Sequence, residues 1–222
     1  MNDKNNSEGK IFQKAIKHHL AGEYNIALNF YQKLIKKNPN IAAVHNNIGL
    51  IQKELKENQL ALKSFLKAID IDSNFIEAHN NIGIIYEEMR DYKKGIFHCK
   101  TAIKLDPNFS KAYNNLGSLY DEIGETNQAI ENYKKCLELN PNSVESYNNL
   151  GSVYRYSGQY DKAIEYYQQG IKIDRNFFKI RKNFGLLLLL LSNFEQGFKE
   201  FEWRIKEKNK KEYRDTKLKS KL

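Results

Sequence analysis

The sequence predicts an all-α solenoid, built from about six helix-turn-helix repeats of equal length. The first observation is a fixed period of roughly 34 residues, clearest in a glycine column that reads Gly49, Gly83, Gly117, Gly151 and Gly185. The second is the helical spacing of apolar residues within each period. Neither helix of a pair could bury its apolar side alone, so successive pairs must stack on one another.

Residues 110–143 show one repeat in full. Apolar residues recur at helical spacing in its first half and again in its second half. Gly124 separates the two halves and Pro141 follows the second, as expected at helix ends. Gly117 falls where the two helices approach each other most closely. A bulky side chain at this position is expected to overpack the contact, at a cost of about 1–3 kcal/mol.

The repeats follow one another without a break over residues 8–41, 42–75, 76–109, 110–143, 144–177 and 178–211. Residues 1–7 are polar and are expected to be disordered. The first repeat has Lys14 where later repeats carry Ile or Leu, which suits a terminal repeat with one face in water. Residues 205–222 carry eight Lys or Arg against three Asp or Glu, so we expect a basic C-terminal helix extension or tail.

Composition favours a cytoplasmic protein. No apolar run approaches the ~20 residues that span a bilayer, and the longest, at 186–191, is six leucines inside the last repeat. The N-terminus lacks the apolar region of a signal peptide. Cys99 and Cys136 fall in apolar columns and are expected to be reduced, buried thiols. A disulfide between neighbouring second helices is the lesser alternative.

The net charge of +9 does not by itself indicate a nucleic-acid partner. The last eighteen residues contribute +5 of it, and the many Tyr and Phe fall in repeat columns, where they are expected to form the core. We therefore expect no nucleic-acid binding by the array, and a solvated tail explains the charge.

No catalytic arrangement stands out, and the sequence predicts that the protein is not an enzyme. Every glycine is explained by a repeat column or a turn, which leaves no phosphate-binding loop. The paired acids Glu87–Glu88 and Asp121–Glu122 are expected near the ends of first helices, facing the groove or water. His18 and His19 point in different directions on a helix. We expect no cofactor and no metal site.

The residues Tyr113-x2-Leu116-Gly117-x2-Tyr120, followed by Ala129-x3-Tyr133 and then Pro141, resemble the tetratricopeptide repeat. The resemblance covers about residues 8–211. It implies a right-handed superhelical solenoid whose first helices line a concave groove. It also implies a protein-interaction scaffold that binds a protein or peptide ligand.

An asparagine column lies two residues before the glycine column: Asn47, Asn81, Asn115, Asn149 and Asn183. Asn is a poor helix former, so five such residues inside helices favour a binding role. Similar arrays, including that of the O-linked N-acetylglucosamine transferase, carry an asparagine ladder at the matching place. The resemblance implies that these residues hold an extended peptide in the groove. The alternative is that each Asn satisfies local backbone groups or the helix end of the next repeat.

A second resemblance concerns the end of the bound peptide. Chaperone cochaperones with similar repeats grip a terminal carboxylate through a Lys–Asn pair, an Asn and a Lys–Arg pair on three successive first helices. Lys111, Asn115, Asn149 and Lys179 match four of these five places. The fifth place has Asn183 instead of Arg, which removes the bidentate fork that Arg offers to a carboxylate.

The last repeat resembles the final repeat of bacterial proteins in which tetratricopeptide arrays precede a glycosyltransferase domain. The matching run extends from Leu186 through Gly197 to Glu202-Trp203-Arg204. A Lys-rich tail follows here, so no transferase activity is carried over. Two alternatives to the peptide scaffold remain open: the non-catalytic half of such a protein, and a self-assembling scaffold that forms homo-oligomers.

Overall fold

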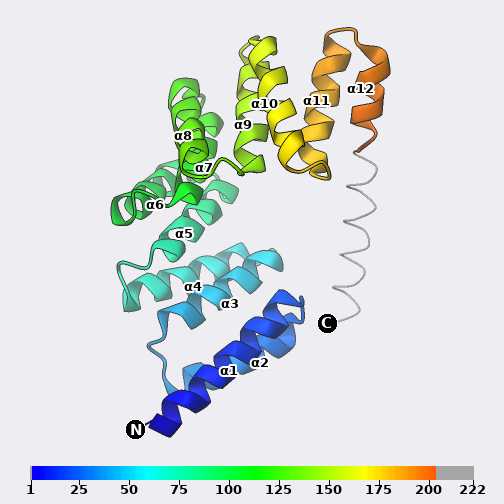
Figure 1. Ribbon diagram of the computed structural model, residues 1–222. Coiled ribbons are helices and arrows are strands. Elements are labelled where there is room, and N and C mark those ends of the chain that lie inside the picture. The colour runs from blue at the N-terminus through cyan, green and yellow to red at the C-terminus, as the bar shows by residue number, and fades with distance from the viewer. Residues whose placement is uncertain (1, 204–222) are drawn as a thin grey trace. The chain divides into compact units, whose positions relative to one another are not determined.

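The computed structural model describes residues 2–203, and this range contains twelve α-helices and no strand (Figure 1). The helices form six antiparallel pairs. The first helices of the pairs are α1 (Asn2–Leu20), α3 (Ala42–Glu54), α5 (Ile76–Glu88), α7 (Ser110–Glu122), α9 (Val144–Tyr156) and α11 (Phe178–Leu190). The second helices are α2 (Tyr24–Lys37), α4 (Asn58–Ile71), α6 (Tyr92–Leu105), α8 (Thr126–Leu139), α10 (Tyr160–Ile173) and α12 (Phe194–Phe201). From α3 onward, each first helix begins one full period after the previous one.

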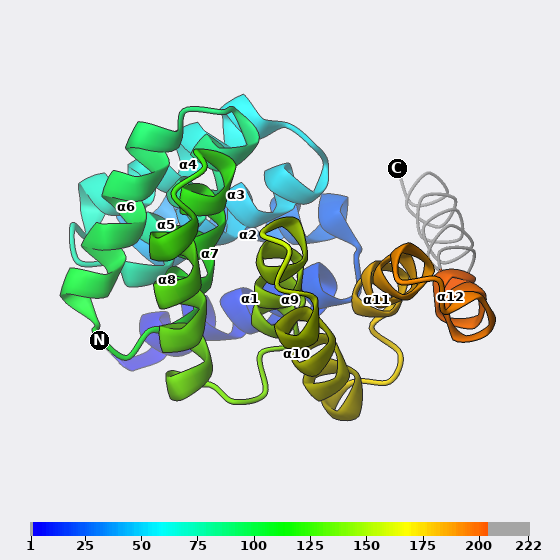
Figure 2. The ribbon, with the colours of Figure 1, turned by 90° about the horizontal axis from the view of Figure 1, so that it is seen from above.

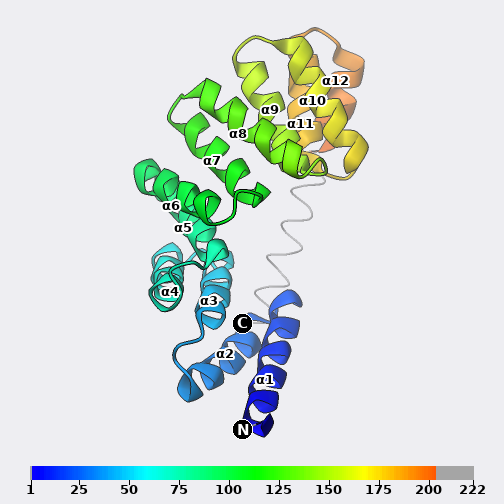
Figure 3. The same cartoon turned by 60° about the vertical axis from the view of Figure 1, so that its left-hand side comes forward.

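The chain divides into two units, which are described separately: unit 1 holds α1–α6 and unit 2 holds α7–α12. In unit 1 the three pairs follow one another, with α3 beside α5 and α4 against α5 (Figure 3). In unit 2, α9 contacts both α7 and α11, and Figure 2 shows the pair α9–α10 followed by the pair α11–α12. Each unit therefore stacks its helix pairs as an all-α repeat solenoid does.

In the core, a glycine on one helix of a pair lies very close to atoms of the partner helix. A Cβ on Gly117 would lie 2.8 Å from Cδ1 of Tyr133, and the Tyr133 side chain is fully buried. In the last pair, a Cβ on Gly185 would lie 2.5 Å from the backbone nitrogen of Phe201. The two helices of a pair therefore approach each other closely at the glycine column, as the sequence predicted.

Two kinds of turn repeat with the helices. The second residue after each first helix has a positive φ, and this column reads Gly22, Lys56, Arg90, Gly124, Gly158 and Ser192. After the second helices, an Asx side chain accepts a hydrogen bond from the backbone N–H two residues on, at Asn38, Asp72, Asp106, Asn140 and Asp174. These side chains end one helix and start the turn to the next.

The structure corrects the expectation for the N-terminal residues and does not describe the C-terminal ones. Helix α1 begins at Asn2, so residues 2–7, which were expected to be disordered, are helical. Residues 205–222, expected to be a basic extension, lie outside the described range, as do the last residues of the sixth repeat.

Cys99 and Cys136 are free and buried, as predicted. Burial, with a smaller contribution from Glu87, raises the pKa of Cys99 to about 12.

Candidate functional site

The predicted ladder residues lie at equivalent places on five first helices. Asn47 is on α3, Asn81 on α5, Asn115 on α7, Asn149 on α9 and Asn183 on α11, and each side chain is half-buried. In each unit separately, the first helices that contact one another carry these amides along their common side.

Hydrogen bonds join the ladder residues to the preceding repeat. Asn81 Nδ2 donates to Asn46 Oδ1 at 2.9 Å, over a separation of 35 residues. The same bond recurs in unit 2, where Asn183 Nδ2 donates to Asn148 Oδ1 at 2.9 Å and Asn149 Nδ2 to Asn114 Oδ1 at 3.4 Å. Three of the five ladder residues therefore link neighbouring repeats, through a side chain of the preceding repeat and not through the helix end of the next one.

The acceptors of these bonds, Asn46, Asn114 and Asn148, belong to a second asparagine column that the sequence analysis did not single out and that also includes Asn80. Asn46 and Asn148 are only 6% and 9% exposed, so these amides need partners inside the protein. The signal was present in the sequence, because an Asn-Asn dipeptide recurs in four successive repeats. The role of the first Asn in the dipeptide could not be predicted, because its hydrogen bond depends on which residues the stacking of repeats brings together.

The bonds between repeats use only part of each ladder amide. An Asn side chain offers two N–H donors and a carbonyl that can accept two hydrogen bonds. In Asn183, Nδ2 is engaged by Asn148 and, at 3.4 Å, by Ser152 Oγ. In Asn149, Oδ1 accepts from Asn148 at 3.2 Å. A half-buried amide held in this way is fixed in orientation and can still present polar atoms on the helix surface.

The ladder begins at Asn47, where the inter-repeat bond has no counterpart. The residue 35 positions before Asn47 is Phe12, which packs against the core of the first repeat. Asn47 instead lies near the hydroxyl of Tyr31, a fully buried side chain. Burial raises the pKa of Tyr31 to about 12, and the nearby Asn47 side chain has a smaller effect that lowers this pKa. The first repeat is therefore joined to the second by apolar packing.

The two predicted lysines both belong to unit 2. Lys111 and Lys179 are the second residues of α7 and α11, and both are exposed. The equivalent residue of α9 is Glu145, which is also exposed. Arg181 is held elsewhere, since its Nη1 pairs with Glu200 Oε2 at 2.6 Å. The four residues that match the carboxylate grip, and Asn183 at its fifth place, thus lie on three first helices of one unit.

Exposed apolar and aromatic side chains extend the first-helix side of unit 2. Leu186 and Leu190 follow Asn183 by three and seven residues, so the three share one side of α11, and Leu190 is 59% exposed. On α9, the Arg155 guanidinium lies 4.2 Å from the ring centroid of the exposed Tyr156. The sequence placed the leucine run in the core, and this holds for Leu187 and Leu188.

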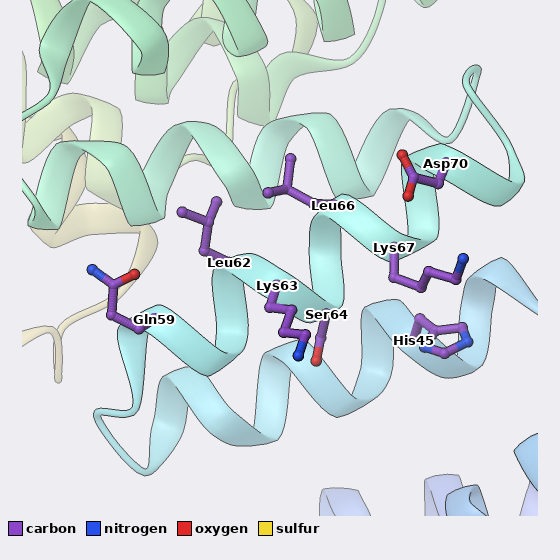
Figure 4. Close-up of a pocket in the computed structure, with 8 residues that line it drawn as sticks. All are labelled: His45, Gln59, Leu62, Lys63, Ser64, Leu66, Lys67 and Asp70. Atoms are coloured by element: carbon purple, nitrogen blue, oxygen red, sulfur yellow. The ribbon is translucent and has the colours of Figure 1, made fainter.

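Other features of the described range give no sign of catalytic chemistry. Among residues 2–203, no group of three or more His, Cys, Asp or Glu side chains could hold a metal ion. None of the helices described has the length and apolar character needed to cross a membrane. An open hollow of about 530 Å³ lies beside α4, and its lining includes His45, Leu62 and Lys67 (Figure 4).

Comparison with known sequences identifies the family. Profiles of the tetratricopeptide repeat match residues 42–75, 76–109, 110–143 and 144–177, which are the repeats carrying the asparagine dipeptide. The chain belongs to the tetratricopeptide repeat family. Its repeats are thus of the kind that serves in protein-interaction scaffolds. No curated protein sequence matches the chain significantly.

Solved tetratricopeptide repeat structures resemble the fold. MamA is 27% identical with a TM-score of 0.60, over 75% of this chain and 97% of MamA. PilF of Pseudomonas aeruginosa is 20% identical with a TM-score of 0.77, over 88% of this chain and 89% of PilF. YrrB, described as having an unusual peptide-binding site, is 20% identical with a TM-score of 0.57, over 79% of this chain and 91% of YrrB. The resemblance of the last repeat to glycosyltransferase-linked arrays and the expected homo-oligomer stay predictions.

Proposed function

We propose that the protein is an interaction scaffold whose first-helix surface binds an extended protein segment. The observation that carries the proposal is the row of Asn115, Asn149 and Asn183 on three successive first helices of unit 2. An amide can donate to a peptide carbonyl and accept from a peptide N–H, so such a row suits a main chain regardless of its sequence.

The surroundings of the row suggest how a bound segment would be oriented. Lys111 and Lys179 add positive charge near the starts of α7 and α11, where a carboxylate of the ligand could be held. Leu190 and Tyr156 add apolar surface near the other ends of α11 and α9. A peptide with an acidic group and a large apolar side chain would meet both.

The hydrogen bonds between repeats dictate how the ladder must be tested. Replacing a ladder Asn by Ala removes a possible ligand contact and also a bond to the preceding repeat, so a loss of binding could reflect a looser stack. Asn148→Ala is a control for Asn183→Ala, since both lose the same hydrogen bond, but it also frees Oδ1 of the ladder residue Asn149. Asn148 is only 9% exposed, and the change removes almost no surface that a ligand could touch.

The experiment selects a peptide from a display library of short unstructured sequences and titrates it calorimetrically. We expect Asn183→Ala to weaken binding by about 0.5–1.5 kcal/mol, the net contribution of one neutral hydrogen bond, while Asn148→Ala weakens it by less. The pair Asn81→Ala and Asn46→Ala repeats the comparison in unit 1. Equal losses within each pair would show that the ladder serves only to join the repeats.

A further inference from the structure

The positive charge of the described range is concentrated on the second helices of unit 1. Helices α2, α4 and α6 carry nine lysines, no arginine and a single acidic residue, Asp70. The second helices of unit 2 carry five lysines against six acidic residues. The two units therefore differ in the charge of the side opposite the ladder, although their repeats have the same fold.

On α6, three of the four lysines form a single stripe with Phe97. Lys93, Phe97, Lys100 and Lys104 are separated by four, three and four residues, which places them on one side of the helix. All four are exposed, and the Phe97 side chain is 64% exposed. The buried residues Gly95, Cys99 and Ala102 occupy the other side of α6. Because most of the Phe97 ring faces water, it contributes little to the core of the repeat.

The other two second helices of unit 1 repeat the combination. On α4, Leu60 (49% exposed) shares a side with Lys63 and Lys67, at spacings of three and four residues. On α2, Ile26 (45% exposed) shares a side with Lys33 and Lys37.

These stripes occupy equivalent places in the repeat. Ile26 and Leu60 are one repeat period apart, as are Lys33 and Lys67, and Lys63 and Phe97. The hollow beside α4 adjoins the middle stripe, because Lys63 and Lys67 form part of its lining (Figure 4). We refer to these ten side chains as the lysine surface of unit 1: Ile26, Lys33, Lys37, Leu60, Lys63, Lys67, Lys93, Phe97, Lys100 and Lys104.

We propose that the lysine surface of unit 1 docks onto a membrane surface rich in anionic lipids. Lysines attract acidic headgroups, and exposed apolar side chains between them can enter the boundary between headgroups and acyl chains. The surface is formed by second helices, whereas the ladder is on first helices, so a scaffold held in this way could bind a protein segment at the same time.

Two other classes of acidic partner fit the surface less well. Nucleic-acid binding proteins commonly read bases through Arg, and the three helices contain none. Phosphate contacts alone would also leave Ile26, Leu60 and Phe97 exposed to water. An acidic protein would be expected to bind a localised cluster of charges, whereas here each of three helices combines one exposed apolar side chain with two or three lysines.

The test measures binding of the full-length protein to vesicles of phosphatidylcholine, with and without phosphatidylglycerol as a third of the lipid. The variant Lys93→Gln/Lys100→Gln/Lys104→Gln removes three charges from the surface. Its matched control, Lys134→Gln/Lys135→Gln/Lys172→Gln, removes three charges from α8 and α10 and leaves the basic C-terminal sequence unchanged. Circular dichroism checks that both variants keep their helices.

We expect binding only to vesicles that contain phosphatidylglycerol, and a weakening of about 100-fold in the α6 variant, since each lysine near the surface contributes about a factor of five. The control variant is expected to change the affinity by far less. Phe97→Ser is expected to weaken binding roughly 10-fold through the loss of apolar insertion. High salt should weaken the wild type strongly.

Several results would overturn the proposal. Equal binding to vesicles without phosphatidylglycerol would mean that the lysines do not act on lipid charge. Equal losses in the α6 variant and its control would place the effect in net charge or in another part of the chain. Duplex DNA that is bound more tightly than the vesicles, with no effect of Phe97→Ser, would identify a nucleic-acid surface instead.

Discussion

At the scale of single residues, the histidine pair of the third repeat shows how burial sets chemistry. His79 Nε2 donates to the carbonyl of Ser73 at 3.1 Å, so its Nδ1 accepts from Nδ1 of His98 at 3.0 Å. The ring of His98 also stacks on Tyr86. Burial, and then repulsion from a protonated His79 ring, lower the pKa of His98 to about 4. The folded protein therefore prefers the neutral form of His98.

This preference predicts a loss of stability in mild acid. In the unfolded chain a histidine has a pKa near 6.5, so between about pH 6.5 and pH 4 the unfolded state binds more protons than the folded state. The free energy of unfolding should fall as the pH decreases through this window. We expect His98 to account for about 1–2 kcal/mol, a figure reduced for its partial exposure to water.

Denaturant unfolding of the wild type and of His98→Gln at neutral pH and near pH 4 checks this prediction. Gln keeps a donor for His79 but does not titrate, so the variant should lose less stability than the wild type. The comparison between the two proteins cancels the contributions of the carboxylates. An identical pH dependence would mean that His98 is not neutral in the fold.

At the scale of secondary-structure elements, the turns after the first helices share one backbone conformation but not one residue type. Gly124 has φ +79° and Arg90 has φ +60° in equivalent turns. In the turn of the third repeat, Arg90 N–H donates to the carbonyl of Glu87 and Asp91 N–H to that of Tyr86, both at 2.9 Å. A left-handed conformation costs a residue with a Cβ about 1–2 kcal/mol more than glycine.

Exchanging residues within this column should therefore change stability in opposite directions. We expect Arg90→Gly to raise the free energy of unfolding by about 0.5–1 kcal/mol, since part of the gain is offset by the greater freedom of glycine in the unfolded chain. Gly124→Arg should lower it by about 1 kcal/mol. A Cβ at Gly124 would meet nothing within 4 Å, so the backbone alone is responsible. Thermal unfolding measures both variants, and changes of the same sign would contradict the explanation.

At the scale of the whole molecule, stability depends on contacts between neighbouring repeats, since each pair packs only on the next. Most of these contacts are apolar, and the asparagine bonds add a polar link that recurs with the repeat. Such a link specifies the register between pairs, because a shifted stack would leave buried amides such as Asn46 without a partner.

A double-mutant cycle on Asn46 and Asn81 measures this link. We expect Asn46→Ala and Asn81→Ala each to be destabilising, with a coupling free energy of about 0.5–1.5 kcal/mol between them. Asn46 with Asn183 is the control pair, since Asn183 bonds Asn148 instead, and its effects should add. Urea unfolding gives the four free energies of each cycle. Additive effects for Asn46 and Asn81 would show that their hydrogen bond contributes nothing.

The sequence by itself determined the fold class, the period and the contacts inside each helix pair. Glycine and alanine columns facing aromatic columns can be read without coordinates, because the two helices of a pair are close in the chain and repeat at a fixed interval. The free, buried state of Cys99 and Cys136 followed in the same way from their columns. The helical start of α1 did not, since a polar stretch has no apolar stripe to indicate a helix.

The tertiary structure decided which side chains meet across repeats and which remain at the surface. The bond from Asn81 to Asn46 links residues 35 apart, one more than the period, and only the stacking of first helices defines that offset. Likewise Leu190 and Phe97 are apolar in sequence, but their exposure depends on what packs against their helices. Whether a side chain is buried depends on the residues packed around it. In a stack of repeats these residues are determined by how the helix pairs dock, and not by the local sequence pattern that forms each helix.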